Sequence, residues 1–353
     1  METVTSDREA NNKALEYIET LFDSSVKIKQ LEKNGKRLLL AGNTESLEPD
    51  VGYLVHVDVV SGRKDQFKLK QESGKLIGRG VSDMKFSIPI GVALVNDLVK
   101  RESDLKMVMV ITTDEEVGGF DGADYLASEV GFAPKNLIVP DGGDDWVFVN
   151  KSKGVLQVKV KSEGSPAHAS RPWLGESAVE PVVKLAAVLL EDYEKSNCEE
   201  SWETTMNIGK IRAGESTNQV SAKAEMELDF RFPESETIDG LFEKVVKKAE
   251  KIDKRLKLEK MSTGQPTATD DSLEVVKAYI ESMENKMGEK MKISGAYGAS
   301  DARHFADLNV PILMSKPTGG DIHGDDEWID VNSCIKFYEA LNLFLKKLEN
   351  SKL

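Results

Sequence analysis

Nearly continuous apolar runs dominate the first part of the chain. Residues 51–60 (VGYLVHVDVV), 107–113 (MVMVITT) and 136–140 (NLIVP) contain few polar side chains. Strands of a parallel sheet have this composition, because helices cover both of their faces. Between the first two runs, residues 86–98 carry apolar side chains at helical spacing. This alternation predicts an α/β domain with a mainly parallel sheet.

The pattern changes to strict alternation after residue 154. Residues 154–161 and 225–232 alternate apolar with polar or charged side chains, which is typical of antiparallel strands with one wet face. Residues 179–190 and 241–252 each carry the apolar stripe of an amphipathic helix. With two strands between the helices and a final short strand at 255–259, the predicted order is βαββαβ. This order resembles a ferredoxin-like sandwich.

The length of the chain favours two domains. At 353 residues it exceeds the size at which a single hydrophobic core usually keeps growing. Helical patterns return after residues 262–271, which have the composition of a polar linker. We therefore predict a core domain formed by residues 1–150 and 262–353, interrupted by an inserted domain at residues 151–261.

Charge and cysteine content narrow the choice of partners and compartment. The 47 basic and 61 acidic residues give a net charge of −14, which disfavours nucleic acid and anionic membranes as partners. The two cysteines, Cys198 and Cys334, lie far apart without metal-type spacing, so we expect neither a disulfide nor a thiolate zinc site. The N-terminus lacks an apolar signal core, and no apolar run approaches the roughly 20 residues that span a bilayer. We expect a cytoplasmic protein.

Two of the four histidines lie beside acidic clusters. His56 and Asp58 are two residues apart in an apolar run, so their side chains point to one face of a strand. Burying such groups costs free energy unless they have partners, and ligands of open α/β sheets collect at the carboxyl ends of strands. The alternative is a core histidine followed by a turn aspartate. His323 lies in a loop rich in glycine and aspartate, DIHGDDE.

Four further carboxylates follow apolar runs or glycine-bearing loops. Asp83 lies in GRGVSDMK, where it could bridge two cations or cap the next helix. Glu115 and Glu116 end the strand at 107–113 and precede two glycines; a solvated acidic turn is the alternative. Asp141 follows the third run, where a simple turn residue is the alternative. Oxygen ligands with imidazoles favour zinc, with manganese or cobalt as alternatives.

These motifs occur in the order found in the M20 metallopeptidases, which the chain resembles over nearly its whole length. The family includes acetylornithine deacetylases, succinyl-diaminopimelate desuccinylases, aminoacylases and carboxypeptidases. The resemblance rests on His-x-Asp at His56, Gly-Arg-Gly-x-x-Asp-Met-Lys at Asp83 and Asp-Glu-Glu-x-Gly at Glu115. It implies a zinc-peptidase-like catalytic domain, and it implies that the inserted domain is a lid, often used for dimerisation.

The resemblance also implies unequal roles for the residues. Glu115 would be the general base, and Asp58 would orient the His56 imidazole. Two divalent cations would be held by five ligands, which are His56, Asp83 and Asp141 at one site, and Asp83, Glu116 and His323 at the other.

Three further residues resemble substrate-contacting positions of the family. His168, in GSPAHASRPW, resembles a lid histidine that stabilises the oxyanion of the reaction, and Asn218, in TNQV, resembles a lid residue near substrate. Arg303, in SDAR, is a candidate for binding a substrate carboxylate bidentately. The alternatives are a solvent-facing loop residue for His168, a turn residue for Asn218 and an exposed helix residue for Arg303. His304 has no motif and is interpreted as structural.

We therefore expect a dinuclear metal-dependent hydrolase that cleaves an amide bond in N-acyl amino acids or short peptides. A metal-activated water would attack the carbonyl carbon, with Glu115 as base. An exopeptidase, either dipeptidase or carboxypeptidase, is one alternative, and a non-catalytic binding protein with the same fold is another. A homodimer formed through the lid domain is expected.

Overall fold

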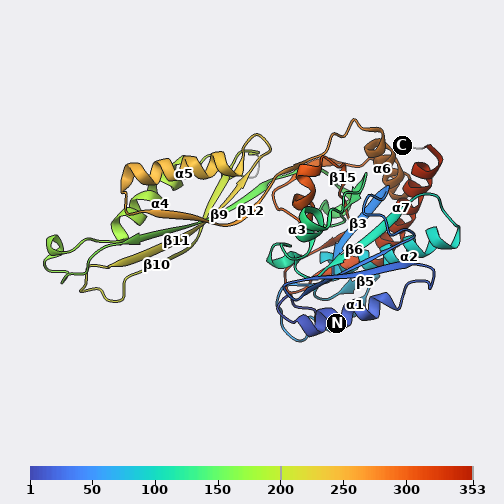
Figure 1. Cartoon of the computed structure of the whole chain (residues 1–353), viewed down its shortest axis with the longest axis horizontal. Coiled ribbons are helices and arrows are strands. Elements are labelled where there is room, and N and C mark those ends of the chain that lie inside the picture. The colour runs from blue at the N-terminus through green and yellow to red at the C-terminus, as the bar shows by residue number, and fades with distance from the viewer. Residues whose placement is uncertain (199–200, 352–353) are drawn as a thin grey trace. The chain divides into compact units, whose positions relative to one another are not determined.

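The computed structural model describes residues 1–198 and 201–351 of the chain. It divides into two compact units (Figure 1). Unit 1 comprises Met1–Lys151, Ala268–Ala296 and Ser300–Leu353, and unit 2 comprises Ser152–Thr267 and Tyr297–Ala299.

Unit 1 is built on a six-stranded mixed sheet. Four neighbouring strands are parallel, and an antiparallel hairpin, which the hydrophobic pattern did not predict, forms one edge. In spatial order the strands are β1 (Lys27–Lys33), β2 (Lys36–Gly42), β6 (Met107–Thr112), β3 (Val51–His56), β7 (Leu137–Ile138) and β15 (Ile312–Leu313).

Helices cover both faces of this sheet, as the continuous apolar runs predicted. Successive residues of β3 face opposite sides, so Tyr53 and Val55 belong to one core cluster and Leu54 to another. The cluster containing Tyr53 is completed by α1 (Arg8–Glu19), α2 (Ser87–Lys100), α6 (Glu274–Met287) and α7 (Val331–Ser351). The other cluster includes residues of α3 (Ala123–Tyr125) and of the helical turns Leu126–Val130 and Asp301–Leu308.

Two smaller sheets lie wholly or mainly in unit 1, and of the residues in their strands only Ser152 and Thr267 belong to unit 2. One has the order β16 (Gly319–Gly320), β17 (Trp328–Asp330), β5 (Lys75–Ile77) and β4 (Lys70–Glu72). The other has the order β13 (Thr267–Ala268), β8 (Phe148–Ser152) and β14 (Ile293–Ala296). In the first of these sheets, Trp328 pairs with Ile77. This antiparallel register places the residue before β17 beside the residue after β5, which brings two distant loops together.

Among its described residues, unit 2 contains one antiparallel sheet and two α-helices. In chain order its elements are β9 (Gly154–Glu163), α4 (Val179–Tyr193), β10 (Thr205–Ala213), β11 (Lys223–Phe232), α5 (Ile238–Ile252) and β12 (Lys257–Gly264). The spatial order of the strands is β10-β11-β9-β12, and all neighbours are antiparallel. Alternate residues of β11, such as Met226 and Leu228, are buried against both helices, which Figure 1 shows beside the sheet.

The last strand of unit 2 is longer than predicted. The sequence pattern predicts that this strand ends at residue 259 and that residues 262–271 form a polar linker. In the structure, Ser262 and Thr263 pair with Gln157 and Leu156 of β9. A shift of register between Lys260 and Ser262 places one extra residue in the strand. Because such a bulge breaks the two-residue period, the alternation could not be followed through it.

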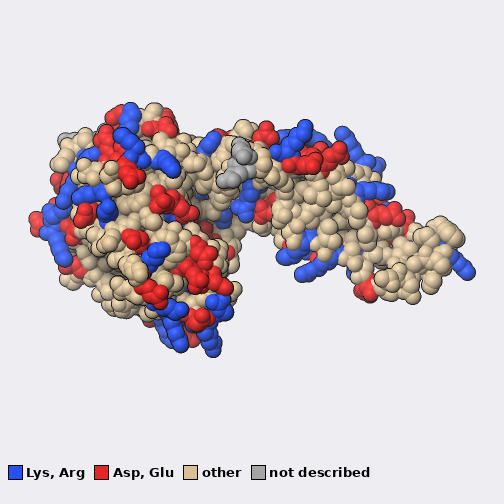
Figure 2. Space-filling model, turned by 180° about the vertical axis from the view of Figure 1, so that it is seen from behind, with Lys and Arg blue, Asp and Glu red and all other residues tan. Residues whose placement is uncertain are grey.

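Charged side chains of both signs are interspersed on the face that Figure 2 shows. Ion pairs of the chain include Lys33 with Glu129 at 2.5 Å and Lys161 with Glu259 at 2.7 Å. Among the described residues, no helix has the length and hydropathy required to cross a bilayer.

Candidate metal centre

Five side chains in unit 1 form two overlapping clusters of ligand type. In each cluster the candidate ligand atoms lie within 4.8 Å of one another. The first cluster contains His56, Asp83 and Asp141, and the second contains Asp83, Glu116 and His323. The structure therefore brings together all five residues proposed as metal ligands, and Asp83 belongs to both clusters.

The parallel strands explain how three of these segments meet. His56 is the last residue of β3, the turn with Glu115 and Glu116 follows β6, and Asp141 follows β7. Because β6, β3 and β7 are parallel neighbours, their carboxyl ends lie at one edge of the sheet. This edge is where ligands of open α/β sheets collect.

Asp83 lies between the two histidines. Its Oδ1 is 3.2 Å from His56 Nε2, and its Oδ2 is 3.1 Å from His323 Nε2. Glu116 Oε2 is 3.2 Å from the same His323 nitrogen. Two tetrahedral zinc ligands, each at about 2.0–2.1 Å from the ion, are about 3.3 Å apart. The spacing and the donor types therefore fit a divalent cation on either side of Asp83.

The electrostatics of the cluster favour added positive charge. Burial, and then the nearby Asp141, raise the pKa of Glu115 well above its ordinary value. Burial, and then Asp83, do the same for Asp141. Hydrogen bonds to Asp83 and Glu116 raise the pKa of His323 to about 10. Each of these shifts favours the protonated form over what is usual for that side chain, and a divalent ion could take the place of such protons.

Asp58 holds two parts of the site together. The residue is fully buried, and its carboxylate accepts hydrogen bonds from the backbone N–H groups of Glu115 and Glu116, both at 3.3 Å. Its Oδ1 is 3.5 Å from His56 Nδ1, while its backbone carbonyl oxygen is nearer, at 3.0 Å. Asp58 thus lies beside the His56 imidazole, and its role in orienting that ring stays a prediction. It also fixes the Glu115–Glu116 turn, which the sequence did not suggest.

Two buried residues at the site were not predicted from the sequence. Glu327 is 1% exposed, and it accepts a hydrogen bond from the backbone N–H of Asp83 at 3.0 Å. Nothing in DIHGDDE distinguishes it from its exposed acidic neighbours Asp325 and Asp326. Lys316 is 3% exposed and forms an ion pair with Asp144 at 2.7 Å. Its positive charge also favours ionisation of Asp83.

Arg303 contacts the loop that follows Glu116. Its guanidinium donates a hydrogen bond of 2.6 Å to the carbonyl oxygen of Gly118, and it lies 6.0 Å from the centre of the Phe120 ring. The Nε2 of His304 is 2.9 Å from the same carbonyl oxygen. Burial, and then the charge of Arg303, lower the pKa of His304 to about 4. Binding of a substrate carboxylate by Arg303 stays a prediction.

His168 and Asn218 lie near each other in unit 2. His168 is in the connection between β9 and α4, and it forms an isolated bridge with Gln219. The backbone N–H of Ala169 donates to the carbonyl oxygen of Asn218 at 2.9 Å. His168 Nδ1 is 2.8 Å from Ser170 Oγ. The structure thus places both proposed substrate contacts on one exposed pair of loops.

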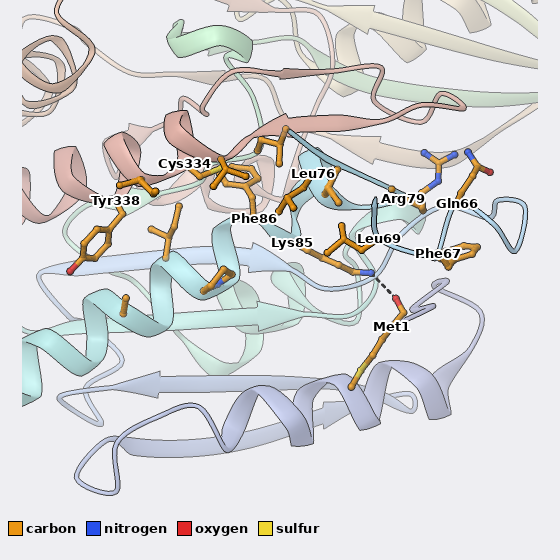
Figure 3. A pocket seen from close by; sticks show the side chains of 18 residues that line it. Met1, Gln66, Phe67, Leu69, Leu76, Arg79, Lys85, Phe86, Cys334 and Tyr338 are labelled. Carbon is orange, nitrogen blue, oxygen red and sulfur yellow. Dashed lines mark hydrogen bonds between the residues drawn. The ribbon is translucent and has the colours of Figure 1, made fainter. Parts of the chain in front are cut away.

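An apolar pocket of about 490 Å³ borders the Asp83 turn without containing the ligands (Figure 3). Its walls include Leu69, Phe86 and Ile335, and the Lys85 ammonium donates to the carbonyl oxygen of Met1 at 3.1 Å. None of the five candidate ligands lines this pocket. The apolar hollow and the candidate metal centre are therefore separate features of unit 1.

Comparisons with known proteins agree with the motifs. A succinyl-diaminopimelate desuccinylase from Cupriavidus necator is 27% identical over 331 residues, covering 90% of this chain and 82% of the relative. A probable carboxypeptidase from Talaromyces marneffei is 26% identical over 246 residues, covering 67% of this chain and 54% of the relative. The fold is shared with an M20 family metallo-carboxypeptidase from Sulfolobus solfataricus, with a TM-score of 0.80, 18% identity and coverage of 99% of this chain and 96% of that one. The model of peptidase family M20/M25/M40 matches residues 52–347, and the chain therefore belongs to this family of amide hydrolases.

Proposed function

We propose that the protein is a dinuclear metal-dependent hydrolase that cleaves an amide bond in N-acyl amino acids or short peptides with a free carboxylate. The observation that carries this proposal is the position of Asp83, whose two carboxylate oxygens each face a different histidine. A carboxylate of this kind can serve two cations at once. Zinc is the proposed metal, because the ligands are imidazoles and carboxylates.

His56, Asp83 and Asp141 would hold one cation, and Asp83, Glu116 and His323 would hold the other. When bound, the cations would activate a water nucleophile and polarise the amide carbonyl. Asp58 would keep the His56 imidazole and the Glu115–Glu116 turn in place during the reaction.

Glu115 is the proposed general base. It is adjacent to the ligand Glu116 but belongs to neither ligand cluster, so its carboxylate is free for proton transfer. Its pKa is raised by burial and by Asp141, which makes it a stronger proton acceptor than an exposed glutamate. Glu115 would take the proton of the attacking water and deliver it to the leaving amine nitrogen.

The inserted unit is proposed to be a ferredoxin-like lid that carries substrate contacts. Its strand order and antiparallel register support this description. His168 would stabilise the developing oxyanion, Asn218 would contact the substrate, and Arg303 of unit 1 would bind a substrate carboxylate. Strands β10 and β12 are the edges of the sheet, and pairing of two lids would give a homodimer.

The relatives include both a desuccinylase and a probable carboxypeptidase. The proposed amide hydrolase activity therefore has two alternatives, that of a deacylase and that of an exopeptidase. A non-catalytic binding protein is less well supported, because the candidate base and all five ligand-type residues are present. A cytoplasmic location stays a prediction.

One experiment tests the proposal. Purified protein is treated with a chelator, dialysed, and assayed before and after addition of zinc against N-succinyl and N-acetyl amino acids, dipeptides and N-blocked peptides. We expect hydrolysis to disappear on chelation and return with zinc, with one substrate class preferred. Hydrolysis that survives complete metal removal, or the absence of hydrolysis from zinc-loaded protein across the panel, would overturn the proposal.

A further inference from the structure

A buried ion pair, Arg79–Glu327, lies beside the candidate metal centre. The guanidinium Nη1 is 3.0 Å from Glu327 Oε2, and the two side chains are 4% and 1% exposed. The pair is brought together by the antiparallel pairing of β5 and β17, because Arg79 follows β5 by two residues and Glu327 immediately precedes β17. Neither residue is one of the five candidate ligands.

Glu327 holds the backbone of the Asp83 turn. Its Oε1 accepts the N–H groups of Ser82 at 2.9 Å and of Asp83 at 3.0 Å. Its Oε2 accepts the N–H of Gly80 at 2.9 Å, in addition to the bond from Arg79. One carboxylate therefore receives three backbone donors and one guanidinium, which fixes the turn from which the Asp83 side chain projects.

Arg79 holds the backbone of the His323 loop. Its Nη2 donates to the carbonyl oxygens of His323 at 3.0 Å and of Gly324 at 3.1 Å. Gln66 supports the same loop, because its side-chain amide donates to the Gly324 carbonyl at 3.0 Å. Figure 3 shows Arg79 and Gln66 side by side.

The two halves of the pair thus act on two different ligand segments. Asp83 and His323 are 240 residues apart in the chain, and their side chains meet at 3.1 Å. We infer that Arg79 and Glu327 are positioning residues that set the separation of the Asp83 turn and the His323 loop, so that both candidate cation sites are formed before any ion binds. This inference rests on the proposed dinuclear site.

The chemistry of the pair suits positioning better than stability. Removing two charges from water is costly, and buried ion pairs often contribute little net stability. Four donors converging on one carboxylate cannot be satisfied by an amide, because an amide oxygen carries no charge and the amide nitrogen is itself a donor. A Glu327→Gln change should therefore release part of the turn while leaving the volume of the side chain nearly unchanged.

The test compares Glu327→Gln and Arg79→Lys with a control, Glu284→Gln. Glu284 is a suitable match because its carboxylate accepts the N–H of Met291 at 3.0 Å and pairs with Lys290 at 2.7 Å, in α6. Metal-free samples are examined by amide hydrogen exchange over residues 78–85 and 321–328. Zinc affinity and stoichiometry are then measured by titration against a competing chelator.

We expect Glu327→Gln to raise amide exchange of the 78–85 segment at least tenfold and to weaken zinc binding at both sites by about 10–100-fold, the usual effect of losing a partner of a ligand. Arg79→Lys should mainly raise amide exchange in the 321–328 segment and weaken the binding of one of the two zinc ions. The control Glu284→Gln should have the same amide exchange and zinc affinity as the parent protein. Because the exchange experiment uses no metal, it reads out positioning independently of the proposed activity.

If the parent protein binds no zinc, the proposed function is refuted. The amide exchange of metal-free samples still tests the positioning role of Arg79 and Glu327 in that case. Parent-like exchange and zinc affinity in folded Glu327→Gln and Arg79→Lys would overturn the positioning role. Failure of both variants to fold at 10 °C, with a folded control, would also overturn it, since the pair would then serve the fold as a whole.

Discussion

His323 Nε2 lies 3.1 Å from Asp83 Oδ2, although a chain of 239 residues separates the two. The contact joins the loop after β16 to the turn after β5. It places His323 opposite His56, with the Asp83 carboxylate between them. This relationship is the geometric basis for proposing two cation sites.

Glu115→Gln should remove most of the turnover while retaining metal. The amide cannot accept the proton of the attacking water, and a positioned general base typically contributes about 10²–10⁴-fold to the rate. The measurement is kcat together with zinc content per chain. Retained zinc with kcat reduced by at least 100-fold is expected. Parent-like kcat would show that another group accepts the proton.

The metal-free protein should become less stable as pH rises from about 6.5 to 10. Asp83 and Glu116 raise the pKa of His323 to about 10, above its ordinary value of 6.5, so the protonated imidazole stabilises the folded state. That contribution is complete below pH 6.5 and is lost as pH rises through 10. Thermal unfolding of chelator-treated protein at several pH values measures this loss of stability. The dependence of stability on pH should be weaker in His323→Gln. Rising stability over this range would contradict the assignment.

Gly80→Ala should destabilise the protein more than Gly74→Ala. Both glycines have positive φ, of 82° and 81°, but a Cβ at Gly80 would lie 2.5 Å from Val59 Cγ1, whereas Gly74 has open space around it. Backbone strain alone costs about 1–2 kcal/mol, which is what we expect at Gly74. The added clash at Gly80 should raise the loss to about 2–4 kcal/mol. Urea unfolding of both variants measures the difference, and equal losses would refute the packing argument.

His168→Ala should lower kcat more than it raises KM. A donor that stabilises only the oxyanion contributes to the transition state and little to substrate binding, and loss of one such donor costs about 10²–10³-fold in kcat. Ser170→Ala is the matched control, because Ser170 Oγ contacts His168 Nδ1 within the same loop. An effect of His168→Ala confined to KM would assign this histidine to substrate binding.

Much of the site could be predicted because its ligands follow recognisable strands. His56 and Asp141 come at or just after buried apolar runs, and the carboxyl ends of neighbouring parallel strands meet whatever the details of packing. Glu327 could not be predicted in this way. Its contacts depend on the pairing of β17 with β5, two three-residue strands about 250 residues apart that leave no periodic signal.

Local composition also hid part of the fold. Strand β1, KIKQLEK, has four charged residues among seven and is mostly exposed, so its pairing with β2 is not visible as an apolar run. The exact end of β12 was hidden by the register shift after Lys260. In both cases the backbone ladder, which sequence periodicity does not report, determines the structure.

The most direct test of the central claim is the anomalous diffraction of zinc-soaked crystals, recorded at the zinc edge. The proposed role of Asp83 predicts two anomalous peaks per chain, about 3.5–4 Å apart, one on each side of its carboxylate. One peak should lie beside His56 and the other beside His323. A single peak, or two peaks that do not share Asp83, would contradict the dinuclear centre.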